Sequence, residues 1–269
     1  MGALSVQILG GAHPLAAEWL RRSEWHPHLQ VRALIAPEHA GLTAEDLHGG
    51  LFGFRSLPVL AGPLGGADLT VICPGWAGDL PAGGGQRLDL RPDHGGFPIL
   101  PELLPPPGPE HLAALTSTVL SAALALEPLL RGRVVSPREA TRAPEAALEA
   151  LPPLLTGHFS LAPWPEAGLC IPLFEGYSEH DALAAYREAY RAGPWVRLRR
   201  DTKPPASVTG SPACELRLRI LPREDPEIPI PLLQVVPALD SVPALAARAV
   251  SALNLSRGWP PLLGLLPNA

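Results

Sequence analysis

The sequence predicts an α/β protein of two domains, and three observations carry this prediction. The first is an apolar run, residues 4–9, that ends in a pair of glycines and leads to Pro14. Proline favours the first position of a helix, so this order predicts strand, glycine turn and helix. The second observation is two further apolar runs, 29–35 and 67–73, which are typical of buried parallel strands. The third is a change after residue 131, where the pattern becomes that of antiparallel strands.

These observations predict a Rossmann-like parallel-sheet domain followed by an α+β domain with a mainly antiparallel sheet. We place the first domain at residues 1–112 and the second at residues 113–240. A last helix, for which Ser241 would be the cap, is expected to run through Leu255, and the segment 241–269 completes the first domain.

Within the first domain, the expected strands after the opening unit are 29–35, 67–73 and 87–90. Thr43 is followed three residues later by Asp46, a spacing that predicts a capping box and a short helix. The elements therefore alternate in the way that builds a parallel sheet.

The second domain opens with the best helical pattern of the chain, residues 115–131, for which Thr116 or Ser117 would be the cap. Ser178 and Asp181 form another capping box, and the helix that they open is followed by a Gly-Pro stop. The remaining segments predict strands near 158–163, 169–174, 195–199, 214–221 and 230–236.

Composition argues against several kinds of partner. The chain has 269 residues, 46% hydrophobic content and a formal net charge of −5, so we expect no nucleic-acid or anionic-membrane partner. No apolar run reaches the roughly 18 residues of a membrane span, and the N-terminus lacks the pattern of a signal peptide. Three widely separated cysteines fit a reducing compartment. We therefore expect a cytoplasmic protein.

The glycine turn after the first strand is the candidate cofactor site. A dinucleotide-binding loop needs glycine where the backbone approaches the pyrophosphate and where the helix packs on the strand. Those positions are Gly10, His13 and Ala16, with Gly11 beside the first, so the loop is degenerate. Glu38, after the second strand, could face a ribose, but a solvent-exposed carboxylate is the favoured interpretation.

Several segments match, in order, the motifs of one known family. The opening GGAHPLAAEWL is similar to GASGYTGAELL, residues 87–93 to DLSADFR, and residues 97–103 to YGLPEL. Residues 210–215 are similar to GSNFCDI, and the segment from Ala238 through the last helix to AIDNLVKGAAGQA. The chain thereby resembles N-acetyl-gamma-glutamyl-phosphate reductase and its lysine-pathway relative, within the semialdehyde dehydrogenase group. This resemblance implies oligomers formed through the sheet of the second domain.

The family reaction is a reductive dephosphorylation in which a cysteine attacks an acyl phosphate and NADPH reduces the thioester. The resemblance places that cysteine at a helix N-terminus, where the helix dipole lowers the thiol pKa. This chain has Ser117 there. Because serine without a paired base is a poor nucleophile and a good helix cap, we favour the capping role.

The other catalytic positions implied by the resemblance are also altered. Residues 156–160 match the start of the family's histidine motif, yet Ser160 takes the catalytic place and His158 is the one candidate histidine. A deletion of the whole motif is an alternative alignment. Glu166 lies near the position of the substrate-binding arginine, and its charge would repel an acyl phosphate. We treat Ser117, His158, Ser160 and Glu166 as vestigial.

Three further features lie outside the resemblance. Cys73 ends a buried strand, where a core residue is favoured over a nucleophile. His26 and His28 alone are a weak metal signal, so we predict no metal. A basic but solvated face is predicted from the arginines of two paired strands: Arg197, Arg199, Arg200, Arg217 and Arg219.

Two hypotheses follow. The first is a catalytically degenerate paralogue of the reductase, a pseudoenzyme without cofactor that acts through protein contacts. It would form a homo-oligomer, or a hetero-oligomer with an active paralogue, through an apolar face of the second domain. The alternative is a divergent NADP-dependent reductase of an acyl phosphate, with Cys73 as a candidate nucleophile. A regulatory protein that binds a small molecule in the old cleft stays open as a third possibility.

Overall fold

The computed structural model describes residues 2–51, 56–82, 85–92, 94–108, 111–132, 169–173, 176–191, 193–199, 208–221 and 232–265. The chain forms two compact units, residues 1–114 with 245–269, and residues 115–244. The boundaries expected from the sequence, at residues 112 and 240, lie close to these limits. Each unit is described by itself below.

The first unit is built on a parallel sheet of seven strands in the order β3-β2-β1-β4-β5-β7-β6. Every pairing in this sheet is parallel, which confirms the predicted Rossmann-like architecture. Its strands are β1 (Leu4–Leu9), β2 (Leu29–Ile35), β3 (Val59–Leu60), β4 (Leu69–Ile72), β5 (Gln86–Asp89), β6 (Phe97–Pro98) and β7 (Leu112–Ala113). Its helical segments are α1 (Pro14–Ser23), η1 (Pro37–His39), α2 (Ala44–Leu47), η2 (Gly49–Leu51) and most of α6 (Ser241–Ser256).

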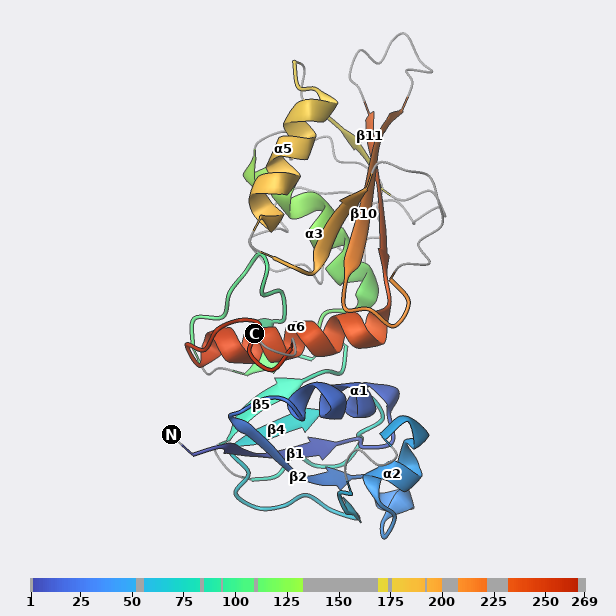
Figure 1. Cartoon of the computed structure of the whole chain (residues 1–269), viewed down its shortest axis with the longest axis vertical. Coiled ribbons are helices and arrows are strands. Elements are labelled where there is room, and N and C mark those ends of the chain that lie inside the picture. The colour runs from blue at the N-terminus through green and yellow to red at the C-terminus, as the bar shows by residue number, and fades with distance from the viewer. Residues whose placement is uncertain are drawn as a thin grey trace. The chain divides into compact units, whose positions relative to one another are not determined.

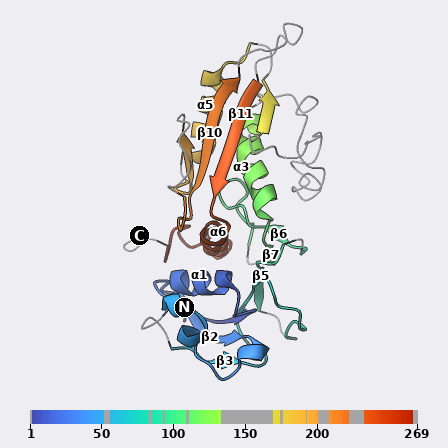
Figure 2. The same cartoon turned by 90° about the vertical axis from the view of Figure 1, so that its right-hand side faces the viewer.

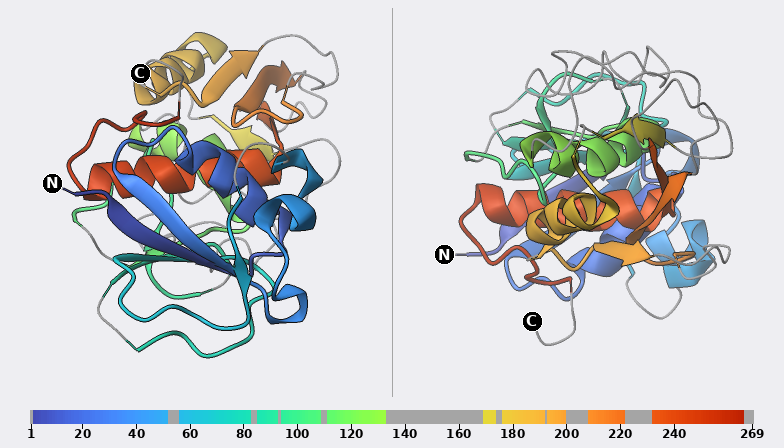
Figure 3. Two further views of the ribbon diagram at one scale, coloured as in Figure 1. Left: turned by 60° about the horizontal axis from the view of Figure 1, so that its bottom comes forward. Right: turned by 90° about the horizontal axis from the view of Figure 1, so that it is seen from above.

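One face of this sheet is covered by helices. Figures 1 and 2 show α1 and α6 on the same side of the strands, and the left view of Figure 3 shows them along the twisted pair β1 and β2. α1 turns Leu15, Trp19 and Leu20 into the core. α6 is apolar around most of its surface, as expected of a helix buried on several sides. Its fully buried Arg248 forms an ion pair with Glu102, at 2.8 Å between Nε and Oε1.

The opposite face is covered by loops. The described parts of the connections from β3 to β4 and from β4 to β5 contain no helix. Side chains from these connections pack on an apolar cluster at the carboxyl half of the sheet. The cluster and its cover comprise Leu9, Ala33, Ile35 and Ile72, with Leu60, Leu64, Trp76 and Leu80 against them.

The second unit contains a mixed sheet of four strands in the order β8-β11-β10-β9. The pairings of β11 with β8 and with β10 are antiparallel, and β10 pairs with β9 in parallel, so the expected mainly antiparallel sheet is confirmed. The elements are α3 (Ser117–Arg131), β8 (Leu169–Pro172), α5 (Glu179–Tyr190), β9 (Val196–Arg199), β10 (Cys214–Leu221) and β11 (Leu232–Leu239). The strand expected near 158–163 lies outside the described residues.

Helix α3 packs against both α5 and β11 (Figure 1). The Tyr186 hydroxyl on α5 donates to the carbonyl of Ala125, and that of Tyr190 donates to the carbonyl of Leu124, at 2.5 Å. These bonds join the buried sides of the two helices, because both tyrosines are buried.

The outer face of this sheet is charged where β9 and β10 form it. Alternation buries Cys214, Leu216 and Leu218 on one face. On the other face are Arg197, Arg199, Glu215, Arg217 and Arg219, of which Arg197 and Arg219 are exposed. Arg199 pairs with the buried Glu215, at 3.2 Å between Nη1 and Oε1. The expectation of an apolar outer face is therefore wrong for β9 and β10, because pairing in register brings their arginines together.

Candidate functional site

The candidate site is the carboxyl edge of the parallel sheet, where open α/β folds bind their ligands. Three segments meet at this edge: the turn after β1, the turn after β4, and the residues that end β5. The turn after β1 and the first turn of α1 carry the positions that the sequence predicted for a cofactor: Gly10, Gly11, His13 and Ala16.

Both glycines of the turn are required by backbone packing. Gly10 has φ of 73°, in the left-handed region, and a Cβ there would lie 2.8 Å from the carbonyl oxygen of Cys73. A Cβ on Gly11 would lie 3.0 Å from that of Leu34. The glycines therefore let β1 lie close to its neighbours, whether or not a ligand is present.

His13 closes the start of α1. It is the N-cap residue, and its Nδ1 accepts a hydrogen bond from the backbone N–H of Leu15 at 3.1 Å. Its carbonyl accepts from the N–H of Ala16 at 2.8 Å, while Pro14 has no N–H to offer. The free N–H groups of a helix N-terminus are what bind a phosphate in this fold. Here the chain uses those first-turn donors itself.

The remaining loop positions have equally local roles. The N–H of Gly11 donates to the carbonyl of Ile35 at 2.9 Å, and the N–H of His13 donates to the carbonyl of Gly10 at 3.1 Å. Ala16 is fully buried, and a small residue there serves the packing of helix on strand. The departure from a working loop is thus concentrated at His13.

A second histidine, not anticipated from the sequence, reaches the same turn. Nε2 of His48 donates to the carbonyl of Gly11 at 2.6 Å. Burial and the nearby His48 together lower the pKa of His13. His13 therefore stays neutral at physiological pH and keeps its acceptor nitrogen, which the cap requires.

Cys73, the candidate nucleophile, is inaccessible. It is 0% exposed, and burial, followed by the charge of Asp89, raises the pKa of its thiol far above the ordinary range. A thiolate is needed for attack on an acyl phosphate. The preference for a core role is consistent with this environment.

Asp89 and Arg91 neutralise each other at the end of β5. Nε of Arg91 donates to Oδ1 of Asp89 at 2.9 Å, and Nη2 donates to Oδ2 at 2.7 Å. Burial alone would raise the pKa of Asp89, but the bonds from Arg91 outweigh it and hold that pKa below its usual value. Nη1 of Arg91 also reaches the carbonyl of Trp76 at 3.4 Å, so the pair ties two turns of the edge together.

Of the four catalytic positions implied by the resemblance, only Ser117 lies in the part of the chain that the structure describes. Ser117 is the first residue of α3, and the cap is Thr116, whose hydroxyl accepts from the N–H of Val119 at 3.2 Å. Of the two candidate caps Thr116 is therefore the one used, and the capping role favoured for Ser117 is wrong because that residue already lies inside the helix. His158, Ser160 and Glu166 lie outside the described residues. Glu38 is exposed in η1, in keeping with the solvated interpretation.

His26 and His28 support the C-terminal segment. Nδ1 of His26 accepts from the N–H of His28 at 3.2 Å, and its Nε2 bonds to Oδ1 of Asn254 at 2.8 Å. The ring of Trp259 lies 5.4 Å from that of His26 and 4.8 Å from that of His28. Both nitrogens of His26 are thus engaged, and the described residues hold no group of three or more metal-ligating side chains.

No family model matches the chain. Within the part of the chain that the structure describes, no helix is long and apolar enough to cross a bilayer.

Proposed function

We propose that this chain is a catalytically degenerate relative of N-acetyl-gamma-glutamyl-phosphate reductase, a pseudoenzyme that works through protein contacts or as a ligand-binding regulator. The observation that carries the proposal is the closed start of α1. Since His13 accepts the N–H groups of Leu15 and Ala16, a pyrophosphate would have to displace bonds that the chain already makes.

The chemistry of the alternative, a divergent NADP-dependent reductase, needs a thiolate beside a nicotinamide. Cys73 and Cys214 are both fully buried. What favours this alternative is that two features of a dinucleotide loop remain: the left-handed glycine, Gly10, and a small buried residue, Ala16, where the helix packs on the strand. We rank it second because the N–H groups of Leu15 and Ala16, which such a loop would offer to a phosphate, already bond to His13.

The partner surface is proposed to lie on the second unit, in a homo-oligomer or a hetero-oligomer with an active paralogue. Its β9–β10 face carries four arginines and one glutamate, so two copies of this face would repel each other, and the face suits an acidic surface of a different chain. A homo-oligomer would have to use another face of the unit. Light scattering of the purified chain at low ionic strength and at about 0.5 M salt tests for the homo-oligomer. A larger species supports it, and a monomer under both conditions contradicts it. Reduced, buried thiols fit the cytoplasm, where we place the protein.

The decisive test of the proposed function is a titration with NADPH. The full chain is titrated to about 5 mM nucleotide while tryptophan fluorescence and melting temperature are followed. We expect no saturable change in either signal. A rise in melting temperature that saturates would restore the reductase hypothesis, and assays with an acyl phosphate would then decide whether the site turns over.

A further inference from the structure

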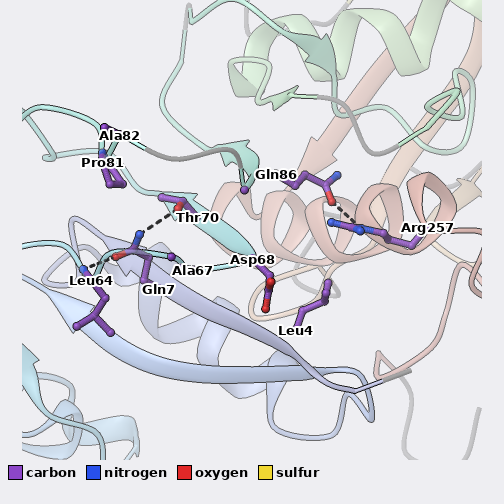
Figure 4. A pocket seen from close by; sticks show the side chains of 12 residues that line it. Leu4, Gln7, Leu64, Ala67, Asp68, Thr70, Pro81, Ala82, Gln86 and Arg257 are labelled. Carbon is purple, nitrogen blue, oxygen red and sulfur yellow. Dashed lines mark hydrogen bonds between the residues drawn. The ribbon is translucent and has the colours of Figure 1, made fainter.

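A cavity lies at the amino edge of the parallel sheet, the opposite edge from the glycine turn. It has a volume of about 430 Å³ and is bounded by the starts of β1, β4 and β5, by the connections that precede β4 and β5, and by the residue after α6 (Figure 4). All of these belong to the first unit. Cavities that hold small molecules have volumes of roughly 300–1,000 Å³, so this one is large enough for a small ligand.

Its inner wall is made of two polar side chains in the middle of the sheet. Gln7 on β1 and Thr70 on β4 stand opposite each other in register and are 1% and 6% exposed. Central strands of a parallel sheet are normally apolar, because burying polar groups is costly. Their presence therefore needs a reason beyond the fold.

The chain holds these two side chains in fixed positions without using all of their hydrogen-bonding capacity. Nε2 of Gln7 donates to the Thr70 hydroxyl at 3.1 Å, and Oε1 of Gln7 accepts from the N–H of Leu64 at 2.8 Å. An amide nitrogen carries two hydrogens, and a hydroxyl that accepts still has its own proton. Figure 4 shows both side chains at the cavity, with the Gln7 amide turned toward Thr70.

Opposite charges lie on the cavity wall outside this pair. Asp68 is exposed, and its Oδ2 accepts from the N–H and the hydroxyl of Ser5, at 2.8 and 2.6 Å, which leaves Oδ1 for another donor. Arg257 is half-buried, and its Nε donates to Oε1 of Gln86 at 2.8 Å, which leaves the terminal nitrogens of the guanidinium. Each charged group is positioned from one side and can be approached from the other.

We propose that this cavity binds a small zwitterion of amino-acid size whose side chain ends in an amide or a hydroxyl group. The ligand carboxylate would meet the guanidinium of Arg257, and its ammonium group would meet the carboxylate of Asp68. Gln7 and Thr70 would then bond to the polar end of the side chain. The proposal goes beyond the degenerate nucleotide loop and does not depend on it, because the two places lie at opposite edges of the sheet.

The test uses the full chain and four probes: L-asparagine, L-glutamine, L-serine and L-threonine. Each is titrated to about 20 mM by calorimetry, with melting temperature as a second signal. At least one probe should give saturable heat and a higher melting temperature. If none of the four produces either signal, the proposal is overturned, whatever the outcome with NADPH.

Variants locate the binding. Asp68→Asn and Arg257→Gln should each weaken the probe at least about tenfold, whereas the exposed controls Asp79→Asn and Arg32→Gln should leave it unchanged. Thr70→Val, which removes the hydroxyl at nearly constant shape, should weaken the probe, whereas Thr70→Ser, which keeps the hydroxyl, should bind it more tightly than Thr70→Val does. Binding that survives both Asp68→Asn and Arg257→Gln at full strength would overturn the assignment to this cavity.

Discussion

The two edges of the parallel sheet treat their polar groups in opposite ways. At the carboxyl edge, polar groups satisfy one another: His13 caps Leu15, His48 bonds to Gly11, and Arg91 neutralises Asp89. At the amino edge, Gln7 and Thr70 bond to each other beside a cavity of about 430 Å³. That bond uses one of the two amide hydrogens of Gln7 and leaves the hydroxyl proton of Thr70 for another acceptor. A fold therefore indicates where ligands usually bind, but a ligand can bind there only if the hydrogen-bond donors at that place are not already engaged within the chain.

The largest expected effect concerns the close approach that shapes the carboxyl edge. Gly10→Ala adds a Cβ 2.8 Å from the carbonyl of Cys73 and forces a left-handed residue, so we expect a loss of about 3 kcal/mol in the free energy of unfolding. Gly75→Ala is the matched control, because its φ is 90° but its Cβ would meet nothing within 4 Å. It should cost about 1–2 kcal/mol by urea denaturation. Equal losses in the two variants would refute the close approach.

The next effect tests the neutralised pair at the same edge. Asp89→Asn leaves the guanidinium of Arg91 without its carboxylate, which should cost about 2 kcal/mol of stability. Asp79→Asn removes an exposed carboxylate and should change the free energy of unfolding by less than about 0.5 kcal/mol. Chemical denaturation of both variants gives the comparison. If Asp89→Asn lowers the free energy of unfolding no more than the control does, the pair of Asp89 and Arg91 does not stabilise the carboxyl edge.

A smaller effect is expected for the cap itself. His13→Ala removes the acceptor for the N–H of Leu15 and should cost about 1 kcal/mol, the usual value of an N-cap. His13→Asn supplies another capping side chain and should recover most of that loss. If the His13→Ala and His13→Asn variants have equal free energies of unfolding in urea denaturation, the imidazole is not acting as a cap.

The smallest effect is a dependence of stability on pH. Burial lowers the pKa of His13 in the folded chain, whereas in the unfolded chain it titrates near its ordinary value of about 6.5. The unfolded state therefore binds the proton first as pH falls, so stability is complete above about pH 6.5 and declines below it. Melting temperatures at about pH 7.5 and 5.5 should differ less in His13→Asn than in the unaltered chain. An identical decline in both would show that His13 contributes nothing to it.

Local patterns allowed much of the fold to be predicted. β2 has the predicted bounds, and both predicted capping boxes form, because a serine or threonine and an aspartate three residues later interact within one turn. The two-residue strands β3 and β7 could not be predicted, since they exist only through pairing with distant neighbours.

The functional groups were harder to predict because their partners are far apart in sequence. His48 reaches Gly11 across 37 positions, Gln7 reaches Thr70 across 63, and Arg257 reaches Gln86 across 171. Sequence reasoning found the degenerate loop position at His13 but not its role as a cap, because histidine is not among the usual capping residues.

The most direct test of the closed loop is the exchange of the Leu15 and Ala16 amide hydrogens, followed by NMR with and without NADPH. The structure predicts slow exchange at both amides, because His13 accepts from each of them, and no change in their signals at about 5 mM nucleotide. Rapid exchange in the free protein, or signals that move as NADPH is added, would contradict the claim that the chain has closed its own nucleotide site.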